Sequence, residues 1–318
     1  MTETILVCGG AGYIGSHMVR LLVDEGFDVV VLDDLSTGHG EAVRGVELIE
    51  ADVRDAVVLD SVFGTRDFDA VMHFCARSLV GESVQQPLAC YDNNVAGSLS
   101  LLRAMQRHGV GKLVFSSTAA IFGEPVSELI GESHPKVPVN PYGHSKLMVE
   151  RILTDACAAS GLRAVSLRYF NAAGASLGGG IGESHDPETH LIPNVLKAAA
   201  GSGQRLKVFG DDYDTRDGTC IRDYIHVDDL ARAHLAALAF MGKEEGFHAF
   251  NLGSGQGYSV LEVIQAAGRV VGSEVPYDVA ERRPGDPPVL VASSTLAAER
   301  LGWRPRVVDL EEIIGSAW

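Results

Sequence analysis

The sequence of 318 residues is poor in positive charge. Its 26 lysines and arginines stand against 42 aspartates and glutamates, which gives a net charge of −16 at pH 7. Because nucleic acids and anionic membrane surfaces attract clustered positive charge, this balance argues against both as partners. Apolar residues still make up 46% of the chain, a share that is typical of a globular protein and too high for a disordered one.

Long apolar runs are missing as well. The longest are strand-length segments such as Asp28–Leu32, well short of the roughly 20 residues that a membrane span needs. The first expected strand begins close to Met1, so we expect no signal peptide. The five cysteines are scattered and form no CxxC pair, which favours free thiols in a reducing compartment. We therefore expect a cytoplasmic protein without a membrane anchor.

The first half of the chain alternates short apolar runs with segments of helical spacing. This alternation predicts βαβ units and an α/β fold with a doubly wound parallel (Rossmann) sheet. We expect strands at Thr4–Val7, Asp28–Leu32, Glu47–Glu50, Ala70–Phe74, Lys112–Phe115 and Ala164–Leu167. We expect helices at Ile14–Glu25, Pro87–His108 and Tyr142–Ser160.

The character of the sequence changes after about Phe170. Glycine-rich and polar loops follow, with one further helix expected at Leu191–Ala200. We interpret residues 1–170 as a Rossmann domain, to which parts of 220–255 return. Residues 171–318 then form a smaller α/β lobe at the C-terminus.

Three glycines, Gly9, Gly12 and Gly15, follow the first expected strand and open the first helix. Such a pattern permits a tight turn and the close approach of a pyrophosphate to a helix N-terminus, although small residues also serve plain helix–strand packing. Asp33 ends the second strand, where a carboxylate can accept from the adenosine ribose. No arginine lies between Asp33 and Gly40 to meet a 2′-phosphate. The pattern therefore predicts NAD rather than NADP.

Asp52 comes at the end of the third expected strand. A carboxylate at this open edge of the sheet can accept from the adenine amino group. It can equally begin the next helix as an N-cap, and its position alone does not decide between the two.

Hydroxyl and amine groups converge in the second half of the expected domain. Thr118 follows a strand, while Tyr142 and Lys146 stand four apart and therefore share one face of a helix. A phenol is a poor base at neutral pH, but a nearby ammonium and a positive nicotinamide ring would lower its pKa. Tyr142 could then take a proton from a substrate alcohol. A surface Tyr/Lys pair is the ordinary alternative.

Longer motifs run along nearly the whole chain, from Thr4 to about Trp303. They include G-G-x-G-Y-I-G-S-H, L-D-D-L, F-S-S-T-A, P-Y-G-H-S-K, R-Y-F-N, I-R-D-Y-I-H-V-D-D-L and R-R-P-G-D. Together they resemble the UDP-glucose 4-epimerases, a family of extended short-chain dehydrogenases/reductases. The resemblance implies NAD-dependent interconversion of UDP-galactose and UDP-glucose through a transient 4-keto sugar.

The resemblance also implies roles for individual residues. The catalytic residues would be Thr118, Tyr142 and Lys146. The cofactor would contact Gly9, Gly12, Tyr13, Ile14, Gly15, Asp33, Asp34, Leu35, Ser36, Thr37, Gly38, Asp52, Val53, Phe74, Cys75, Ala76, Ser78, Asn93, Tyr142, Lys146 and Phe170. The UDP-hexose would contact Thr118, Tyr142, Asn171, His190, Leu191, Val208, Phe209, Arg222, Tyr224, Val260, Arg283, Asp286 and Leu290.

Two of these arginines also make sense from charge alone. A UDP-sugar is an anion, and local charge-assisted bonds must outweigh the repulsion of an acidic protein. Arg222 and Arg283 suit that purpose. Arg222 could instead pair with a neighbouring aspartate, Asp223 or Asp228, and Arg283 could simply be solvated.

Other proteins with the same fold catalyse different reactions or accept different sugars. Nucleotide-sugar 4,6-dehydratases need an acid and a base after the threonine, where this chain has Ala119 and Ala120, so we disfavour dehydration. Leu290 occupies the position that gates the sugar pocket in the family and is intermediate in size, so N-acetylhexosamines stay open as substrates. Pentose and uronate sugars would need the same catalytic residues. A dinucleotide-binding sensor without turnover is disfavoured because Tyr142 and Lys146 are present.

Two further expectations concern metal and assembly. A metal site could be formed by His185, Asp186, Glu188 and His190, but the spacing is not HExxH and we expect a solvated loop without metal.

Apolar residues on the two long predicted helices favour a homodimer, because the corresponding helices form the dimer interface in the family that this sequence resembles. They could instead only cover the sheet. These residues are Val95, Leu99, Leu102, Leu147, Val149 and Leu153.

Overall fold

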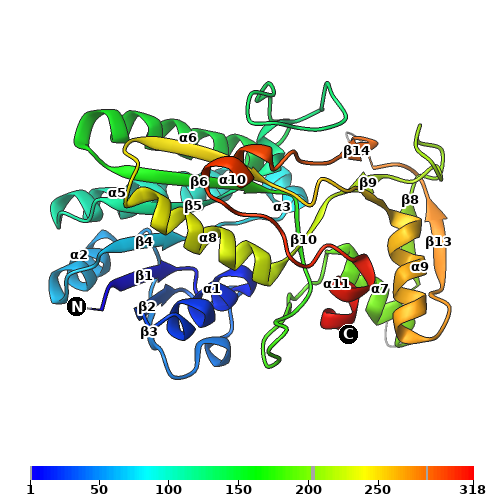
Figure 1. Cartoon of the computed structure of the whole chain (residues 1–318), viewed down its shortest axis with the longest axis horizontal. Helices are drawn as coiled ribbons and strands as arrows, with labels where there is room; N and C mark the ends of the chain where they lie inside the picture. Colours follow the sequence, from blue (N-terminus) through cyan, green and yellow to red (C-terminus); the bar gives the residue numbers. More distant parts are fainter. Residues whose placement is uncertain (1, 202–204, 284–285) are drawn as a thin grey trace.

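A seven-stranded sheet forms the centre of the molecule. The computed structural model describes residues 2–201, 205–283 and 286–318 (Figure 1). The strand order is β11-β6-β5-β4-β1-β2-β3, and all neighbouring strands are parallel. The predicted doubly wound α/β fold is confirmed. The strands span β1 Thr4–Cys8, β2 Asp28–Asp33, β3 Glu47–Glu50, β4 Ala70–His73, β5 Lys112–Thr118, β6 Arg163–Tyr169 and β11 Phe247–Leu252.

Helices cover both faces of this sheet. Side chains alternate along β1, so Ile5 enters the core beneath α1 and α8 while Leu6 enters the core beneath α2, α5 and α6. A parallel sheet needs this double cover because both of its faces are apolar. The helices span α1 Tyr13–Asp24, α2 Ala56–Thr65, α5 Gly97–Arg107, α6 Pro141–Ser160 and α8 Val227–Met241.

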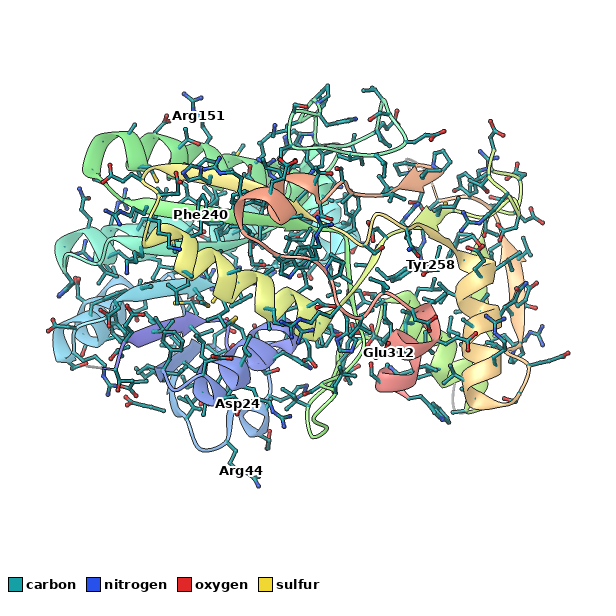
Figure 2. All side chains as sticks on the ribbon, in the orientation of Figure 1. Asp24, Arg44, Arg151, Phe240, Tyr258 and Glu312 are labelled. Atoms are coloured by element: carbon teal, nitrogen blue, oxygen red, sulfur yellow. The ribbon has the colours of Figure 1, made fainter. Side chains whose placement is uncertain are left out.

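Residues beyond 220 return to this sheet. Strand β11 pairs with β6 at its edge, and α8 packs against α1 and the sheet. Figure 2 labels Phe240 on α8, whose ring lies 5.4 Å from that of Phe250 on β11 in an edge-to-face contact. The first 170 residues therefore contribute six of the seven strands of the sheet, and a later segment contributes the last.

Two predicted elements differ from the structure by more than two residues, and the other predicted strands and helices differ by two residues or fewer at each end. Strand β5 continues through Thr118, three residues beyond the predicted end, because it pairs with the full length of β6. The predicted helix Pro87–His108 is divided into α4 Pro87–Tyr91, a π-helical turn Asp92–Ala96 and α5. Helix α2, which begins at the N-cap Asp55, was not predicted.

The C-terminal lobe is smaller and packs around its own core. Helices α7 Leu191–Ala199, α9 Val260–Val271 and α11 Leu310–Ala317 pack against one another beside short two- and three-stranded sheets (Figure 1). Two further short helices belong to the sheet domain: α10 Thr295–Arg300 packs on β11, and α3 Val80–Gln85 packs on α6. The strands span β7 Asn171–Ala173, β8 Leu206–Phe209, β9 Ile221–Arg222, β10 Tyr224–His226, β12 Tyr258–Ser259, β13 Tyr277–Ala280 and β14 Val289–Leu290.

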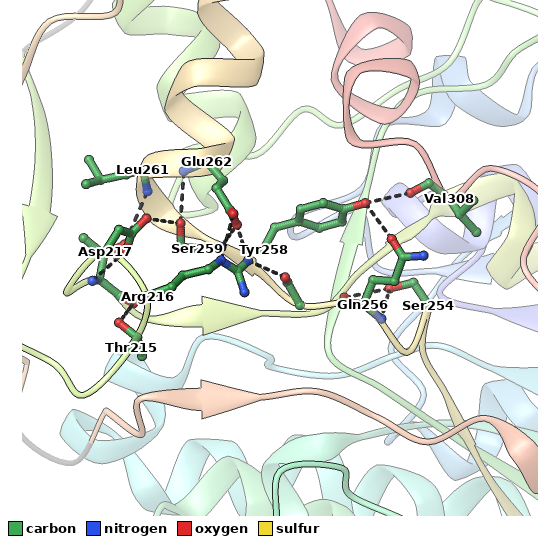
Figure 3. Close-up of polar contacts among 12 residues, drawn as sticks. Thr215, Arg216, Asp217, Ser254, Gln256, Tyr258, Ser259, Leu261, Glu262 and Val308 are labelled. Carbon is green, nitrogen blue, oxygen red and sulfur yellow. Dashed lines mark hydrogen bonds and ion pairs between the residues drawn. The ribbon is translucent and has the colours of Figure 1, made fainter.

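The start of α9 is held by a capping network (Figure 3). The Ser259 hydroxyl accepts from the backbone N–H of Glu262 at 3.1 Å, and the Glu262 carboxylate accepts from the backbone N–H of Ser259 at 2.8 Å. Arg216 donates to the same carboxylate at 2.7 Å. Because Tyr258 lies opposite Arg222 in the β12–β9 pair, this network also fixes the strand that carries Arg222.

Two further observations bear on the compartment. All five cysteines carry free thiols. Among the residues that the structure describes, none of the helices has the length and apolar character that crossing a membrane requires.

Candidate active site

The glycine loop between β1 and α1 has no room for side chains at two positions. Gly9 has φ of +80°, and a Cβ there would lie 2.6 Å from the backbone nitrogen of Cys75. A Cβ on Gly15 would lie 2.1 Å from the Gly9 carbonyl oxygen. Gly12 is the N-cap of α1 and has no side chain to cap the first N–H groups of the helix, and residues 12–15 line the cavity described below. This geometry fits the pyrophosphate of a dinucleotide.

Asp33 shapes the same loop from the end of β2. One carboxylate oxygen accepts from the backbone N–H of Ala11 and the other from that of Leu35, both at 2.9 Å. The side chain is buried, which raises the pKa of Asp33 against the effect of these two bonds. Each oxygen keeps a second lone pair, so the predicted contact to a ribose remains compatible with the structure.

Asp52 is not a helix N-cap, since that position of α2 belongs to Asp55. The backbone N–H of Arg54 donates to Asp52 at 2.8 Å, and its guanidinium binds both Asp52 and Asp92. Arg54 thereby lowers the pKa of Asp52. The carboxylate stays ionised and held in place at the open edge of the sheet.

Helix α6 brings Tyr142 and Lys146 to the carboxyl end of β5. The Asn140 side chain caps the helix by accepting from the N–H of Gly143 at 2.9 Å. The Lys146 ammonium donates to the Ser116 carbonyl at 2.8 Å and lies 4.6 Å from the centre of the Phe115 ring. It is only 2% exposed, and burial lowers the pKa of Lys146 to about 8.

The Tyr142 phenol has the opposite shift. Burial raises its pKa to about 12, and a hydrogen bond with Thr118 offsets part of that rise. Lys146 does not lower this pKa in the chain by itself, and its ammonium donates to the Ser116 carbonyl. Thr118, at the end of β5, is therefore the side chain of this chain that favours the phenolate.

A buried carboxylate that the sequence analysis missed anchors α6. Glu150 lies one turn after Lys146 and accepts from Ser117 at 2.7 Å and from Ser166 at 2.8 Å. Arg168 on β6 binds both of its oxygens, at 2.9 and 2.6 Å. Glu150 thus joins the helix that carries the Tyr/Lys pair to β5 and β6. The sequence signal that could have identified Glu150 is its position four residues after Lys146, on the same face of the helix.

The π-helical turn supplies a second missed residue, Asn94. Its amide donates to Ser145 on α6 at 2.9 Å, and its carbonyl oxygen accepts from the backbone N–H of Arg77 at 2.8 Å. Ser145 in turn donates to the Tyr142 carbonyl at 2.7 Å. Asn94 therefore connects the segment after β4 with the start of α6.

Two adjoining cavities collect most of the predicted site residues. One, of about 460 Å³, lies between the glycine loop and α6, and the other, of about 910 Å³, lies within the C-terminal lobe. Asn171, His190, Arg222 and Asp286 line both. The first is also lined by Gly9, Gly12, Tyr13, Ile14, Gly15, Thr37, Phe74, Ala76, Ser78, Thr118, Tyr142, Lys146, Phe170 and Leu290. The second is also lined by Leu191, Phe209, Tyr224, Val260 and Arg283.

Other predicted residues do not line either cavity. Val208 is 1% exposed in the core of the C-terminal lobe, so its side chain cannot reach a ligand. Val53 is buried beneath the sheet edge. The other predicted cofactor contacts that line neither cavity are Asp33, Asp34, Leu35, Ser36, Gly38, Asp52, Cys75 and Asn93.

The two arginines have partners other than those considered from sequence. Arg222 is paired with Asp286, not with Asp223 or Asp228. The Arg283 guanidinium lies 4.0 Å from the centre of the Phe209 ring, which holds it at the second cavity. Both cations therefore stand where an anionic ligand would enter.

The loop before α7 differs from the expectation of a solvated segment. The side chains of Glu183 and Glu188 are 7% and 4% exposed, and both approach His185 and His190. These carboxylates raise the pKa of His185 to about 9 and, against the effect of burial, that of His190 to about 10. Asp186 does not join the group, and Glu183 was not predicted.

Comparison with known proteins identifies the family. The sequence profile of the NAD dependent epimerase/dehydratase family matches residues 5–253. A UDP-glucose 4-epimerase from Halalkalibacterium halodurans is 52% identical over 314 residues, which cover 99% of this chain and 94% of that protein. The chain belongs to the UDP-glucose 4-epimerase family.

Solved structures of the epimerase family agree with this membership. The UDP-glucose 4-epimerase of Brucella ovis, solved in complex with NAD, superposes with a TM-score of 0.97 at 49% identity, covering 99% of this chain and 97% of that one. The enzyme of Bifidobacterium longum, solved with NAD+ and UDP, gives 0.94 at 40% identity, with the same coverage of both chains. The predicted family, the Rossmann fold and the NAD cofactor are confirmed at this level.

Proposed function

We propose that this chain interconverts UDP-galactose and UDP-glucose through a transient 4-keto sugar. One observation carries the proposal: Thr118, Tyr142 and Lys146 line the same cavity as the glycine loop, beside the anion-facing Arg222. The names of the relatives, which are UDP-glucose 4-epimerases, support the same conclusion.

Tyr142 is the acid and base of this reaction. The Tyr142 phenolate takes the proton of the C4 hydroxyl, and Thr118 stabilises this phenolate through the hydrogen bond that favours the charged form. When bound, NAD supplies the hydride acceptor and a positive ring that lowers the cost of the phenolate. Lys146, buried and held at Ser116, would orient the nicotinamide ribose of bound NAD.

The C-terminal lobe binds the nucleotide diphosphate. Arg222 exchanges Asp286 for a phosphate oxygen, and Arg283 approaches from the Phe209 side of the second cavity. The small side chains of Ala119 and Ala120 line the first cavity, which leaves room for the keto sugar to turn its other face. Neither alanine can transfer a proton, so the site does not support the elimination of a 4,6-dehydratase.

The test is to incubate the purified chain with UDP-galactose, without added NAD, and to separate the products by chromatography. Formation of UDP-glucose is expected, and it also shows that NAD stays bound through purification. No conversion even after NAD is added would overturn the hexose assignment and favour pentose or uronate sugars. A 4-keto-6-deoxy product would contradict the argument from Ala119 and Ala120.

We also propose a homodimer built on α4 and α6. Leu88 is 82% exposed and Met148 is 46% exposed, which leaves an apolar surface on these helices. Val149 and Leu153, two residues that we expected in the interface, lie in the core instead. A mass measurement that gives only monomer at micromolar concentration would overturn this proposal.

The compartment is a further proposal. Five free thiols, two of them fully buried or nearly so at Cys8 and Cys90, suit a reducing environment, so we place the enzyme in the cytoplasm. Fractionation of cells that make the chain, with detection in the cytoplasmic fraction, tests this.

A further inference from the structure

The loop between β7 and α7 gathers four metal-ligating side chains from eight consecutive positions. These are Glu183, His185, Glu188 and His190, and their ligand atoms all lie within 4.8 Å of one another. The closest contacts join each imidazole Nδ1 to a carboxylate oxygen. His190 Nδ1 lies 2.8 Å from the Glu183 carboxylate and 3.0 Å from the Glu188 carboxylate. His185 Nδ1 lies 3.2 Å from the Glu183 carboxylate and 3.8 Å from the Glu188 carboxylate.

Two of these atoms are buried without a hydrogen bond. Among the described residues, Glu183 Oε1 and His185 Nδ1 have no hydrogen-bond partner, although they lie 3.2 Å apart and the Glu183 side chain is only 7% exposed. A buried carboxylate is costly unless a cation faces it, and here Glu183 Oε1 faces two imidazole nitrogens, His190 Nδ1 at 2.8 Å and His185 Nδ1 at 3.2 Å. His185 Nδ1 and Glu183 Oε1 approach each other without hydrogen-bond geometry, as two ligands of one ion would.

We propose that Glu183, His185, Glu188 and His190 bind one Zn²⁺ ion as a structural site. Zinc prefers four tetrahedral nitrogen and oxygen ligands at about 2.0–2.1 Å, which places neighbouring ligand atoms about 3.3 Å apart. The four observed contacts lie around that value. Imidazole nitrogens favour zinc over Mg²⁺ and Ca²⁺, which take oxygen ligands. Two carboxylates balance the charge of the ion.

The surroundings prepare the ligands. Glu188 Oε1 accepts from the backbone N–H groups of Thr189 and His190, each at 2.8 Å, which orients its other oxygen toward His185. Such outer contacts tune and hold metal ligands. Four protein ligands leave no open position, so the ion holds the loop rather than acting on the substrate.

The loop is well placed for such a clamp. Glu183, His185 and His190 line the cavity that contains the glycine loop, and the His185 ring lies 6.1 Å from that of Tyr13 at the start of α1. The neighbouring Ser184 carbonyl contacts His39 Nε2, beyond β2, at 3.0 Å. A bound ion would therefore fix the segment that joins the C-terminal lobe to the cofactor side.

The experiment measures metal rather than turnover. The purified full chain is treated with a chelator, dialysed against ZnCl2 at micromolar free metal, and analysed for zinc by mass spectrometry. We expect one Zn²⁺ per chain and a rise in Tm of about 5 °C relative to the chelated protein. MgCl2 in place of ZnCl2 should give neither. Binding of less than one ion per chain would overturn the proposal and leave a cluster of ion pairs.

Variants locate the site. Glu183→Gln and His185→Ala should each weaken zinc binding at least about 100-fold, because loss of even an outer partner costs 10–100-fold. His108→Ala is the matched control, since His108 also faces a carboxylate, Asp60 at 3.3 Å, but on the far side of the sheet domain. Unchanged binding in both loop variants would place the ion elsewhere and overturn the proposal. The zinc measurement on the unaltered chain holds even if a variant fails to fold.

Discussion

Glu150 and Arg168 form a buried ion pair between α6 and β6, with each side chain 4% exposed. The pair is bidentate, and two serine hydroxyls complete the bonding of Glu150. The helix that carries Tyr142 and Lys146 is therefore held to the sheet by a polar contact inside the core. Removing one partner would leave the other charge uncompensated.

Glu150→Ala should destabilise the chain by about 3–5 kcal/mol, because it leaves the Arg168 guanidinium buried and unpaired. The measurement is the free energy of unfolding in urea. Asp155→Ala is the control on the same helix, since Asp155 pairs with Arg151 at the surface, where both side chains are mostly exposed. That exposed pair should contribute at most about 1 kcal/mol. Equal losses in the two variants would contradict the role of Glu150.

Tyr142→Phe should lower kcat by about 10²–10⁴ while leaving the amount of bound NAD unchanged, because the ring keeps its packing and only the proton carrier is lost. Epimerase turnover and the NAD content of the purified variant are the two measurements. Tyr277→Phe, on the exposed strand β13, is the control and should keep full activity. If Tyr142→Phe retains turnover, another group moves the proton.

Lys146→Met should be more stable than the unaltered chain at pH 7, although inactive. The pKa of Lys146 falls from 10.5 to about 8 on burial, so between these values the unfolded chain binds a proton that the folded chain does not. The contribution of Lys146 to the free energy of unfolding therefore rises with pH between about 8 and 10.5. The free energy of unfolding of the variant should exceed that of the unaltered chain by about 3 kcal/mol at pH 7, and most of this difference should disappear by about pH 10. Urea unfolding at both pH values tests this, and a constant difference would contradict it.

Leu290 should govern the size of sugar that the first cavity admits, since it is partly buried and lines that cavity together with Tyr142. Leu290→Ala should raise kcat/KM for UDP-N-acetylgalactosamine relative to UDP-galactose by about tenfold or more, because a few methylene groups are removed. Leu290→Tyr should shift the ratio the other way. Comparing kcat/KM for both sugars is the measurement. A ratio that does not change in either variant would remove Leu290 from the sugar pocket.

Much of the Rossmann domain follows from local patterns. Strand β3 spans Glu47–Glu50 as predicted, and α6 differs from its prediction by one residue, because apolar periodicity and N-cap chemistry are local properties. The glycine loop was equally readable. Gly9 and Gly15 face backbone atoms so closely that no other residue fits, which leaves a pattern in the sequence itself.

Contacts between segments far apart in the sequence could not be predicted from local patterns. A π-helical turn divides the helix before β5, and Asn94 in that turn bonds to Arg77 and Ser145. The pairing of Arg222 with Asp286 joins positions 64 apart in sequence. Neither partner is marked by spacing, because such bonds depend on how the chain folds back on itself.

The sequence by itself determined the parallel sheet, the NAD-binding loop and the Tyr142/Lys146 pair, because each is encoded by residues near one another along the chain. Only the tertiary structure decided the rest. It held the Lys146 ammonium at the Ser116 carbonyl and placed Glu150 beneath the site. It also closed a loop that spacing suggested was solvated, so that two carboxylates are buried against two imidazoles. The physical reason is that burial, and with it charge pairing, is set by all the segments that pack around a group.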